Sequence, residues 1–290
     1  MVLVLLFASC EDEIEKTYTG DLQVRFLSAD ADFFVQDKAE GYDVLDIQVS
    51  LIGLSTKDVT VSVEVVPIDA PAGEFVAVEG TDFEPVGSIT IPKGEYTGSL
   101  ELRGKYSGVS DGSLKNLRLK LVSTDAPVAE NYSEVQYRLR QYCPFIPANY
   151  EGTWDVNDIS KYDGEIPTYQ VTLTHKGSNV AAMVDTMIVN NLWEFGADHI
   201  VIVDHSNPAK FTVSIPEQEL GYTHPTYGVI LIAEKSEGVT NSCDLTISTN
   251  YDVFVDAGFF DEVLSSEWTK ASGGKSAASQ PRDVKALELR

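Results

Sequence analysis

Four histidines are the most obvious candidates for acid–base chemistry or metal binding. They are His175, His199, His205 and His224. His199 and His205 are six positions apart, an even spacing that would put both on one face of a continuous strand. No His-Glu-x-x-His motif, nucleophile elbow, phosphate-binding loop or dinucleotide glycine fingerprint accompanies them. We therefore expect ordinary surface histidines, no catalytic residues, no metal, no cofactor, and a protein that is not an enzyme.

Two stretches hold residues suited to binding a sugar or a peptide. They are "NNLWEFG" (residues 190–196) and "LGYTHPTYG" (residues 220–228). Binding sites commonly combine aromatic walls with a few polar groups that fix orientation. The predicted ligand-binding residues are Trp193, Tyr222, Tyr227, Asn190 and Asn191. The alternative interpretation is that these rings pack the ends of a barrel, and we expect Trp154 to lie in the core.

Charge and composition limit the partners. The 290 residues carry a net charge of −24, from 45 acidic and 21 basic residues. Such a surface repels phosphate backbones, so nucleic acid is not an expected partner. A hydrophobic content of 43% is enough for buried cores.

Alternation of apolar and polar residues predicts strands almost everywhere after residue 20. Clear examples are residues 45–51, 59–65 and 117–121, and turn residues such as those of "VPIDAPAG" and "IPKGEYTG" separate them. Residues 21–146 therefore predict an immunoglobulin-like β-sandwich. Strands resume after Pro147. Their number and even spacing predict that residues 147–270 form a second antiparallel sandwich or a lipocalin-like barrel, which carries the candidate ligand site. Residues 271–290 predict a flexible tail.

Three cysteines are present. Cys143 and Cys243 would lie at the entrance of the second domain and at a late strand. Either a disulfide joins them, which would attach the first residues of this domain to its sheet, or they are two buried thiols.

The third cysteine has a different setting. "LLFASCEDEIEK" places Cys10 after a short apolar run and before four acidic residues. This pattern resembles the lipobox of bacterial lipoproteins. The resemblance implies that residues 1–9 are a cleaved signal peptide, that Cys10 carries the lipid anchor, and that residues 10–20 are a tether. The acidic flank resembles the signal that sends Bacteroidota lipoproteins to the outer face of the outer membrane.

The first domain resembles the Calx-β family. "VEGTDFEPVGSITIPKGEYTGSLELRG" carries the family's Gly-x-Asp-aromatic turn at Gly80, Asp82 and Phe83, and its second turn at Pro92 to Glu95. Calx-β modules can bind calcium, and Asp82 matches one acidic position. The second acidic cluster of the family is missing, so we expect Asp82 to cap its own turn.

The whole layout resembles surface lipoproteins of Sus-type nutrient importers, and "GTWDV" at residues 152–156 is similar to the first strand of lipocalin-like barrels. The resemblance implies a non-catalytic outer-membrane lipoprotein that captures glycan or peptide, with a TonB-dependent barrel and its lid lipoprotein as partners. Two alternatives are a structural or adhesive lipoprotein and a surface hydrolase. "DTM" at residues 185–187 also resembles the Bacteroidota O-glycosylation motif, with Thr186 as acceptor.

Overall fold

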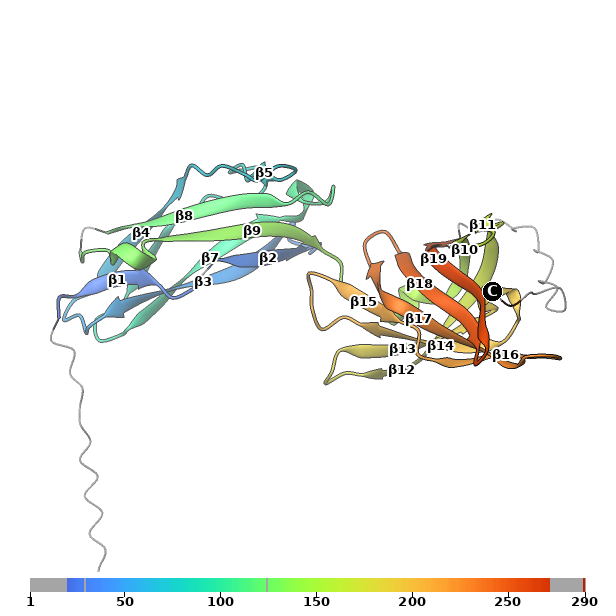
Figure 1. The fold of residues 1–290 in the computed structure, drawn as a ribbon. Coiled ribbons are helices and arrows are strands. Elements are labelled where there is room, and N and C mark those ends of the chain that lie inside the picture. Colours follow the sequence, from blue (N-terminus) through green and yellow to red (C-terminus); the bar gives the residue numbers. More distant parts are fainter. Residues whose placement is uncertain (1–19, 29, 124, 272–288, 290) are drawn as a thin grey trace, which may run out of the picture. The chain divides into compact units, whose positions relative to one another are not determined.

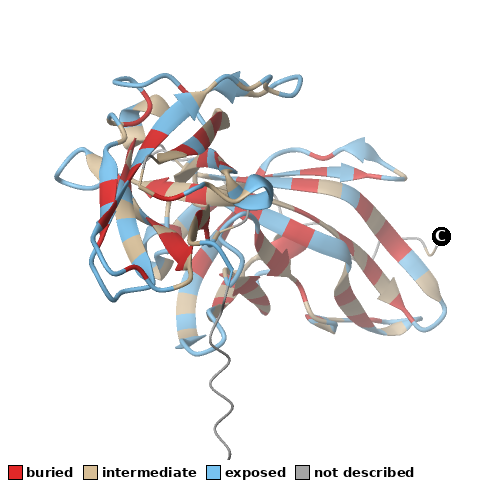
Figure 2. Cartoon of the chain, turned by 90° about the vertical axis from the view of Figure 1, so that its left-hand side faces the viewer, coloured by how far each residue is buried: buried red, intermediate tan, exposed pale blue. Residues whose placement is uncertain are grey.

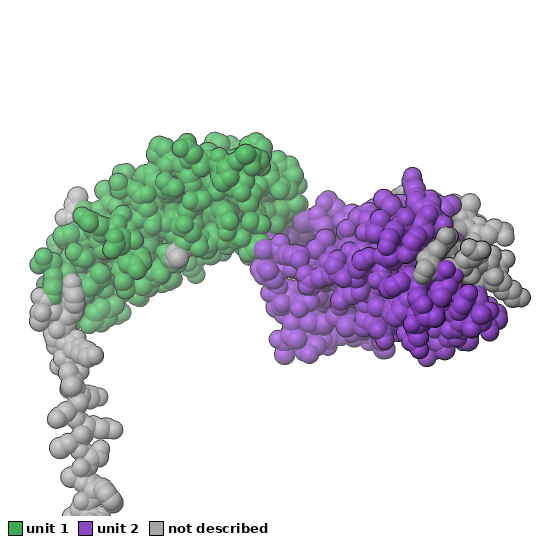
Figure 3. All heavy atoms as spheres, in the orientation of Figure 1, with its two compact units in different colours: residues 1–141 green, residues 142–290 purple. Residues whose placement is uncertain are grey.

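The computed structural model describes residues 20–28, 30–123, 125–271 and 289. The chain divides into two compact units, residues 1–141 and 142–290 (Figure 3), so the boundary expected near Pro147 falls within the second unit. The predicted leader and the predicted lipid-attachment residue Cys10 lie outside the described residues, as do nearly all of the predicted tether and tail. Within the described residues, no helix is long and apolar enough to span a bilayer.

Unit 1 is a sandwich of two sheets. One sheet has the order β1 (Gln23–Phe26), β3 (Tyr42–Ile52) and β7 (Thr97–Lys105). The other has the order β2 (Ala31–Gln36), β9 (Glu134–Tyr142), β8 (Lys115–Ser123), β4 (Val59–Val66) and β6 (Ser88–Ile91), and β5 (Phe75–Val76) pairs with β8. Ile47 on β3, Val61 on β4 and Leu119 on β8 are fully buried, as their alternation with polar residues predicts. Buried and exposed stretches alternate along many of the strands in Figure 2.

Unit 2 is a closed antiparallel barrel of eight strands (Figure 1). In ring order these are β10 (Gly152–Ser160), β12 (Tyr169–Asn179), β13 (Val184–Asn190), β14 (Asp198–Asp204), β15 (Phe211–Ser214), β17 (Gly228–Asn241), β18 (Thr246–Val255) and β19 (Gly258–Lys270), which pairs with β10. The short β11 (Gly164–Glu165) pairs with β10, and β16 (Gln218–His224) pairs with β17. A sandwich followed by a barrel confirms the predicted fold class, with the barrel as the correct alternative for the second half.

Large side chains fill the barrel. Trp154, Trp193, Trp268, Tyr169 and Tyr251 are each at most 1% exposed and belong to one hydrophobic core. Trp154 is a core residue, as predicted from the sequence. The ligand surfaces available in this structure are therefore the barrel's ends and its outside, rather than an open interior.

The two ends of the barrel differ. We call one end the disulfide end, because the disulfide between Cys143 and Cys243 lies there. At this end β14 and β17 finish and β15 and β18 begin. At the other, the Trp193 end, β10 and β13 finish and β12 and β14 begin, so the segment from residue 191 to 197 crosses it.

A short segment is fastened to the disulfide end. Cys143 and Cys243 are disulfide-bonded, with their Cα atoms 5.2 Å apart. Phe145 packs on Tyr150 with ring centroids 4.5 Å apart, and Tyr150 precedes β10 at the end of the single α-helical turn α1 (Pro147–Tyr150). The Tyr150 hydroxyl is 2.9 Å from the hydroxyl of Thr240. The segment from residue 143 to 150 is thus part of unit 2.

The disulfide closes a loop of 100 residues that contains most of the barrel. Replacing both cysteines with serine should lower the free energy of unfolding of this unit by about 2–4 kcal/mol, because the unfolded chain regains loop entropy. Calorimetry of the full chain should show a lower transition temperature for one unit only. A double variant whose two transitions match those of the original chain would contradict this role.

Candidate functional site

The two stretches that the sequence singled out meet at the Trp193 end of the barrel. Phe195 stacks on Tyr222 with ring centroids 6.0 Å apart and planes 8° from parallel. Gly221, with a φ of +86°, lies so close to Ala197 that a Cβ at this position would collide with it. The sequence predicted both stretches but not their contact. Phe195 was not singled out, although its position two residues after Trp193 could have indicated it.

Trp193 does not form the predicted surface platform. It is 1% exposed and lies in the barrel core, packed against Phe195 at 5.2 Å between ring centroids. Its backbone N–H donates to the Tyr169 hydroxyl at 3.2 Å. The physical reason is that the short turn η3 (Leu192–Glu194) folds inward and uses the indole to fill the end of the barrel.

The two asparagines hold this loop together. Asn191 has a φ of 72°, a conformation that asparagine tolerates better than most residues. Its side chain donates to the Gln170 carbonyl at 2.8 Å and accepts from the Gly196 N–H at 3.0 Å. Asn190 donates to the Gly196 carbonyl at 3.0 Å and to the Asp198 carboxylate at 2.9 Å. In this structure, both side-chain amides position the loop.

Tyr222 and Tyr227 are the predicted residues with accessible ring surface. Tyr222 is half-buried under its stack with Phe195. Tyr227 lies in the turn between β16 and β17, is 39% exposed, and stacks on His224 with ring centroids 4.8 Å apart. Phe260 supports the pair, with its ring centroid 5.4 Å from that of His224. An exposed ring on such a rigid support can stack on an apolar ligand face.

Two further predicted residues lie away from this end. Asp82 is 4% exposed and accepts the Val78 N–H at 2.7 Å, which is the turn-capping role expected for it. Thr186 lies within β13, between partners on β12 and β14, and is half-buried.

The histidines are less exposed than expected. His199 faces the interior at the start of β14 and is fully buried, and His224 is only 7% exposed, so the expectation of a surface residue is wrong for both. His175 and His205 each place Nε2 2.8 Å from a different oxygen of the Asp185 carboxylate, and Ser178 donates to the same group. Burial raises the pKa of Asp185, but these hydrogen bonds outweigh it and lower the pKa overall. The Asp185 carboxylate lies at the centre of this cluster. In a catalytic serine–histidine–aspartate triad, by contrast, the imidazole lies between the other two groups.

A buried carboxylate in the barrel escaped the sequence analysis. Asp158 is fully buried and accepts hydrogen bonds from Tyr169 at 2.9 Å, Tyr251 at 2.6 Å and Ser266 at 2.6 Å. Burial is the main cause that raises the pKa of both tyrosines well above the usual value, and the Asp158 charge adds to it. The alternation of "TWDVND" puts Asp158 on the inward face with Trp154, a signal that could have found it.

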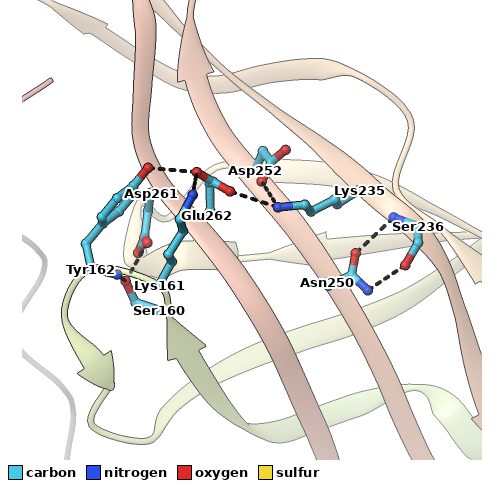
Figure 4. Close-up of polar contacts among 9 residues, drawn as sticks. All are labelled: Ser160, Lys161, Tyr162, Lys235, Ser236, Asn250, Asp252, Asp261 and Glu262. Atoms are coloured by element: carbon cyan, nitrogen blue, oxygen red, sulfur yellow. Dashed lines mark hydrogen bonds and ion pairs between the residues drawn. The ribbon is translucent and has the colours of Figure 1, made fainter. Parts of the chain in front are cut away.

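The outside of the barrel carries a cluster of charged residues near the Trp193 end (Figure 4). The Glu262 carboxylate accepts hydrogen bonds from Lys161 at 2.5 Å, Tyr162 at 2.7 Å and Lys235 at 2.8 Å. These three donors lower the pKa of Glu262 to about 2. The cluster links β19 to β17 and to the turn after β10, so it fixes the wall of the barrel.

No protein-family profile matches the chain, and no curated protein matches its sequence. Three of the solved structures that the chain resembles come from Bacteroides. A protein of unknown function from Bacteroides ovatus has 11% identity and a TM-score of 0.37, over 85% of this chain and 89% of that one. A putative carbohydrate binding protein from Bacteroides ovatus has 12% identity and a TM-score of 0.33, over 85% and 70%. An auxiliary nutrient binding protein from Bacteroides thetaiotaomicron has 13% identity and a TM-score of 0.30, over 83% and 89%.

The Glu262 cluster predicts a pH dependence with a definite sign. Because the folded-state pKa is lowered from 4.5 to about 2, the stabilisation is present above pH 4.5 and is lost as the pH falls toward 2. Glu262→Gln should lower the melting temperature at pH 7, and the difference from the original chain should shrink between pH 5 and pH 3.

Glu237→Gln is the matched control, because the Glu237–Lys210 pair, at 2.8 Å, is more than half exposed on both sides and should contribute little. Melting curves of the Glu262→Gln variant that run parallel to those of the original chain at every pH would contradict the assignment.

Proposed function

We propose that this protein is a non-catalytic, surface-exposed outer-membrane lipoprotein that captures a glycan or a peptide for a Sus-type TonB-dependent transporter. The observation that carries the proposal is the meeting of the two aromatic stretches at the Trp193 end of the barrel. Phe195 stacks there on Tyr222, and the β16–β17 turn presents Tyr227 with 39% of its surface exposed. Rigidly held rings beside polar groups are the usual elements of a binding surface.

The lipid anchor and the location are part of the same proposal. They rest on the "FASC" motif at Cys10 and on its acidic flank. The anchor would precede unit 1 in the sequence, whereas the candidate surface is formed by residues 190–228 of unit 2.

A second candidate is a structural or adhesive lipoprotein that contacts protein partners. Three neighbouring apolar residues of unit 1 favour it, because Phe75, Val76 and Val78 are 54%, 46% and 56% exposed. Contiguous exposed apolar surface commonly marks a protein contact.

A pull-down of the tagged, lipidated chain from native outer membranes in mild detergent separates the two candidates. Recovery of a TonB-dependent barrel with its lid lipoprotein supports nutrient capture. Recovery of other surface proteins without a transporter would favour the adhesive candidate.

The binding surface itself can be tested with an array of plant, microbial and mucin glycans and a library of short peptides. Tyr227→Ala should weaken binding of any captured ligand about tenfold, which corresponds to the loss of about 1.4 kcal/mol of stacking. Tyr96→Ala is the matched control, because Tyr96 of unit 1 is 55% exposed and far in sequence from the candidate surface. Equal losses in both variants, or no loss in either, would contradict the assignment.

A further inference from the structure

A strip of apolar side chains lies on the outside of the barrel, close to the turn that carries Tyr227. Its members come from β17, β18 and β19, which lie side by side (Figure 1), and are Val229, Leu231, Phe254 and Phe259. Leu231 pairs opposite Phe254, and Phe254 pairs opposite Phe259, so these three side chains form a row across the strands. Val229 is two positions before Leu231 and therefore faces the same side. We call these residues the outer strip.

The outer strip is accessible and separate from the barrel core. Val229 is 43% exposed and Phe259 is 38% exposed, whereas Leu231 and Phe254 are half-buried. The ring centroids of Phe254 and Phe259 lie 6.1 Å apart. None of the strip's residues belongs to the core cluster of the barrel, against which Leu289 packs. Apolar side chains that gather on a surface commonly mark a contact with another molecule.

The outer strip continues the candidate surface around the rim of the barrel. Tyr227 is two positions before Val229 in the chain, and its ring contacts that of Phe260 edge-on, with centroids 6.0 Å apart. Phe260 points into the barrel directly after Phe259, which points outward. The Tyr227 turn and the outer strip therefore meet at the first residues of β19, and an extended ligand can contact both.

Carboxylates flank the outer strip. Glu219 on β16 pairs opposite Leu231, and Asp256 lies in the turn between β18 and β19; both are exposed. Within the part of the chain that the structure describes, neither carboxylate has an ion-pair or hydrogen-bond partner. Lys161 and Lys235, on the same side of the barrel, both donate to the carboxylate at the centre of the cluster in Figure 4, at 2.5 Å and 2.8 Å. Glu219 and Asp256 are therefore available to pair with the cations of a partner.

The chemistry of the strip and of its surroundings favours a peptide over other occupants. Sugar rings stack on flat aromatic faces, but Val229 and Leu231 are aliphatic. A second copy of the chain has the same net charge of −24 and would bring the same carboxylates against the strip. An anionic membrane surface would be repelled for the same reason. A peptide with apolar side chains between lysines or arginines is complementary both to the strip and to its carboxylates.

We propose that the outer strip binds the apolar side chains of an extended, positively charged peptide, whose lysines or arginines pair with Glu219 and Asp256. The peptide runs from the Tyr227 turn over the rim of the barrel and along the strip. This inference rests on the proposed capture function, and it names a cationic peptide rather than a glycan as the captured ligand.

The test is calorimetric titration of the full chain with three synthetic peptides of equal length. One alternates lysine with leucine, the second alternates glutamate with leucine, and the third alternates lysine with serine. At low salt the lysine–leucine peptide should bind about tenfold more tightly than either of the others, and added salt should weaken its binding. Equal binding of the glutamate–leucine peptide would overturn the charge pairing. Equal binding of the lysine–serine peptide would overturn the role of the apolar strip.

Two pairs of variants locate the binding of the lysine–leucine peptide. Val229→Ser should weaken it about fivefold, whereas Val239→Ser should not, because Val239 is 38% exposed but lies in the other half of the same strand. Glu219→Gln should weaken it about threefold, and Glu237→Gln, also exposed and also in the far half of β17, should not. These side chains are exposed, so the variants should fold. Equal losses in a strip variant and its control, or no loss in either, would overturn the assignment.

Tyr227→Ala separates this inference from the proposed function. Binding of a neutral glycan that depends on Tyr227, together with no preference for the lysine–leucine peptide, would overturn the cationic peptide and leave the proposed function intact. Peptide binding that depends on Val229, together with no ligand that depends on Tyr227, would contradict the proposed site but support the outer strip. Sedimentation covers the remaining occupant, because self-association that Val229→Ser abolishes would show a second copy on the strip and overturn the peptide.

Discussion

The barrel of unit 2 depends on one buried carboxylate. Asp158 on β10 accepts hydrogen bonds from Tyr169 on β12, Tyr251 on β18 and Ser266 on β19. β10 and β19 are the first and the last strand of the barrel, and their pairing closes the ring. The Asp158 carboxylate therefore also joins the two strands that close the barrel. A buried charge tolerates little change in its surroundings, because the loss of a donor leaves part of the charge uncompensated. The hydrogen bond to Asp158 fixes the Tyr169 hydroxyl, which in turn accepts the backbone N–H of Trp193.

The two ends of the barrel then take different roles. The disulfide, the Phe145–Tyr150 packing and the Asp185 cluster fasten the chain at one end, where His205 also stacks on Phe145 with ring centroids 5.1 Å apart. The other end carries the two aromatic stretches, where the Tyr227 ring is 39% exposed and stacks on His224. Exposed rings on a rigid support are typical of a ligand-binding surface. This contrast is why we assign function to the Trp193 end.

The sequence predicted the architecture well because alternation is a local signal. Ile47, Val61 and Leu119 are buried where their strands' alternation puts them, and the same rule places Trp154 in the barrel. The candidate site was only partly predictable. Its two stretches could be recognised from their aromatic content, but their contact depends on β16 lying beside β14, where the Gln218 side chain accepts the Ile200 N–H and donates to the Ile200 carbonyl.

The burial of Trp193 and His199 could not be predicted for a related reason. A tryptophan in a loop-like stretch is typical of either a surface platform or a core residue, and only the left-handed turn decides that the indole points inward. His199 stands one residue inside β14, where a shift of one position would have exposed it. Asp158 was hidden among 45 acidic residues, although its alternation with Trp154 marks it as inward-facing.

The central claim is that ligands meet this protein at the Trp193 end of the barrel. Hydrogen-exchange mass spectrometry of the full chain, with and without a mixture of soluble extracellular glycans and peptides, tests it most directly. Changes in exchange should concentrate in residues 190–198 and 218–228. Changes confined to unit 1 around residues 75–78, or to the disulfide end, would contradict it.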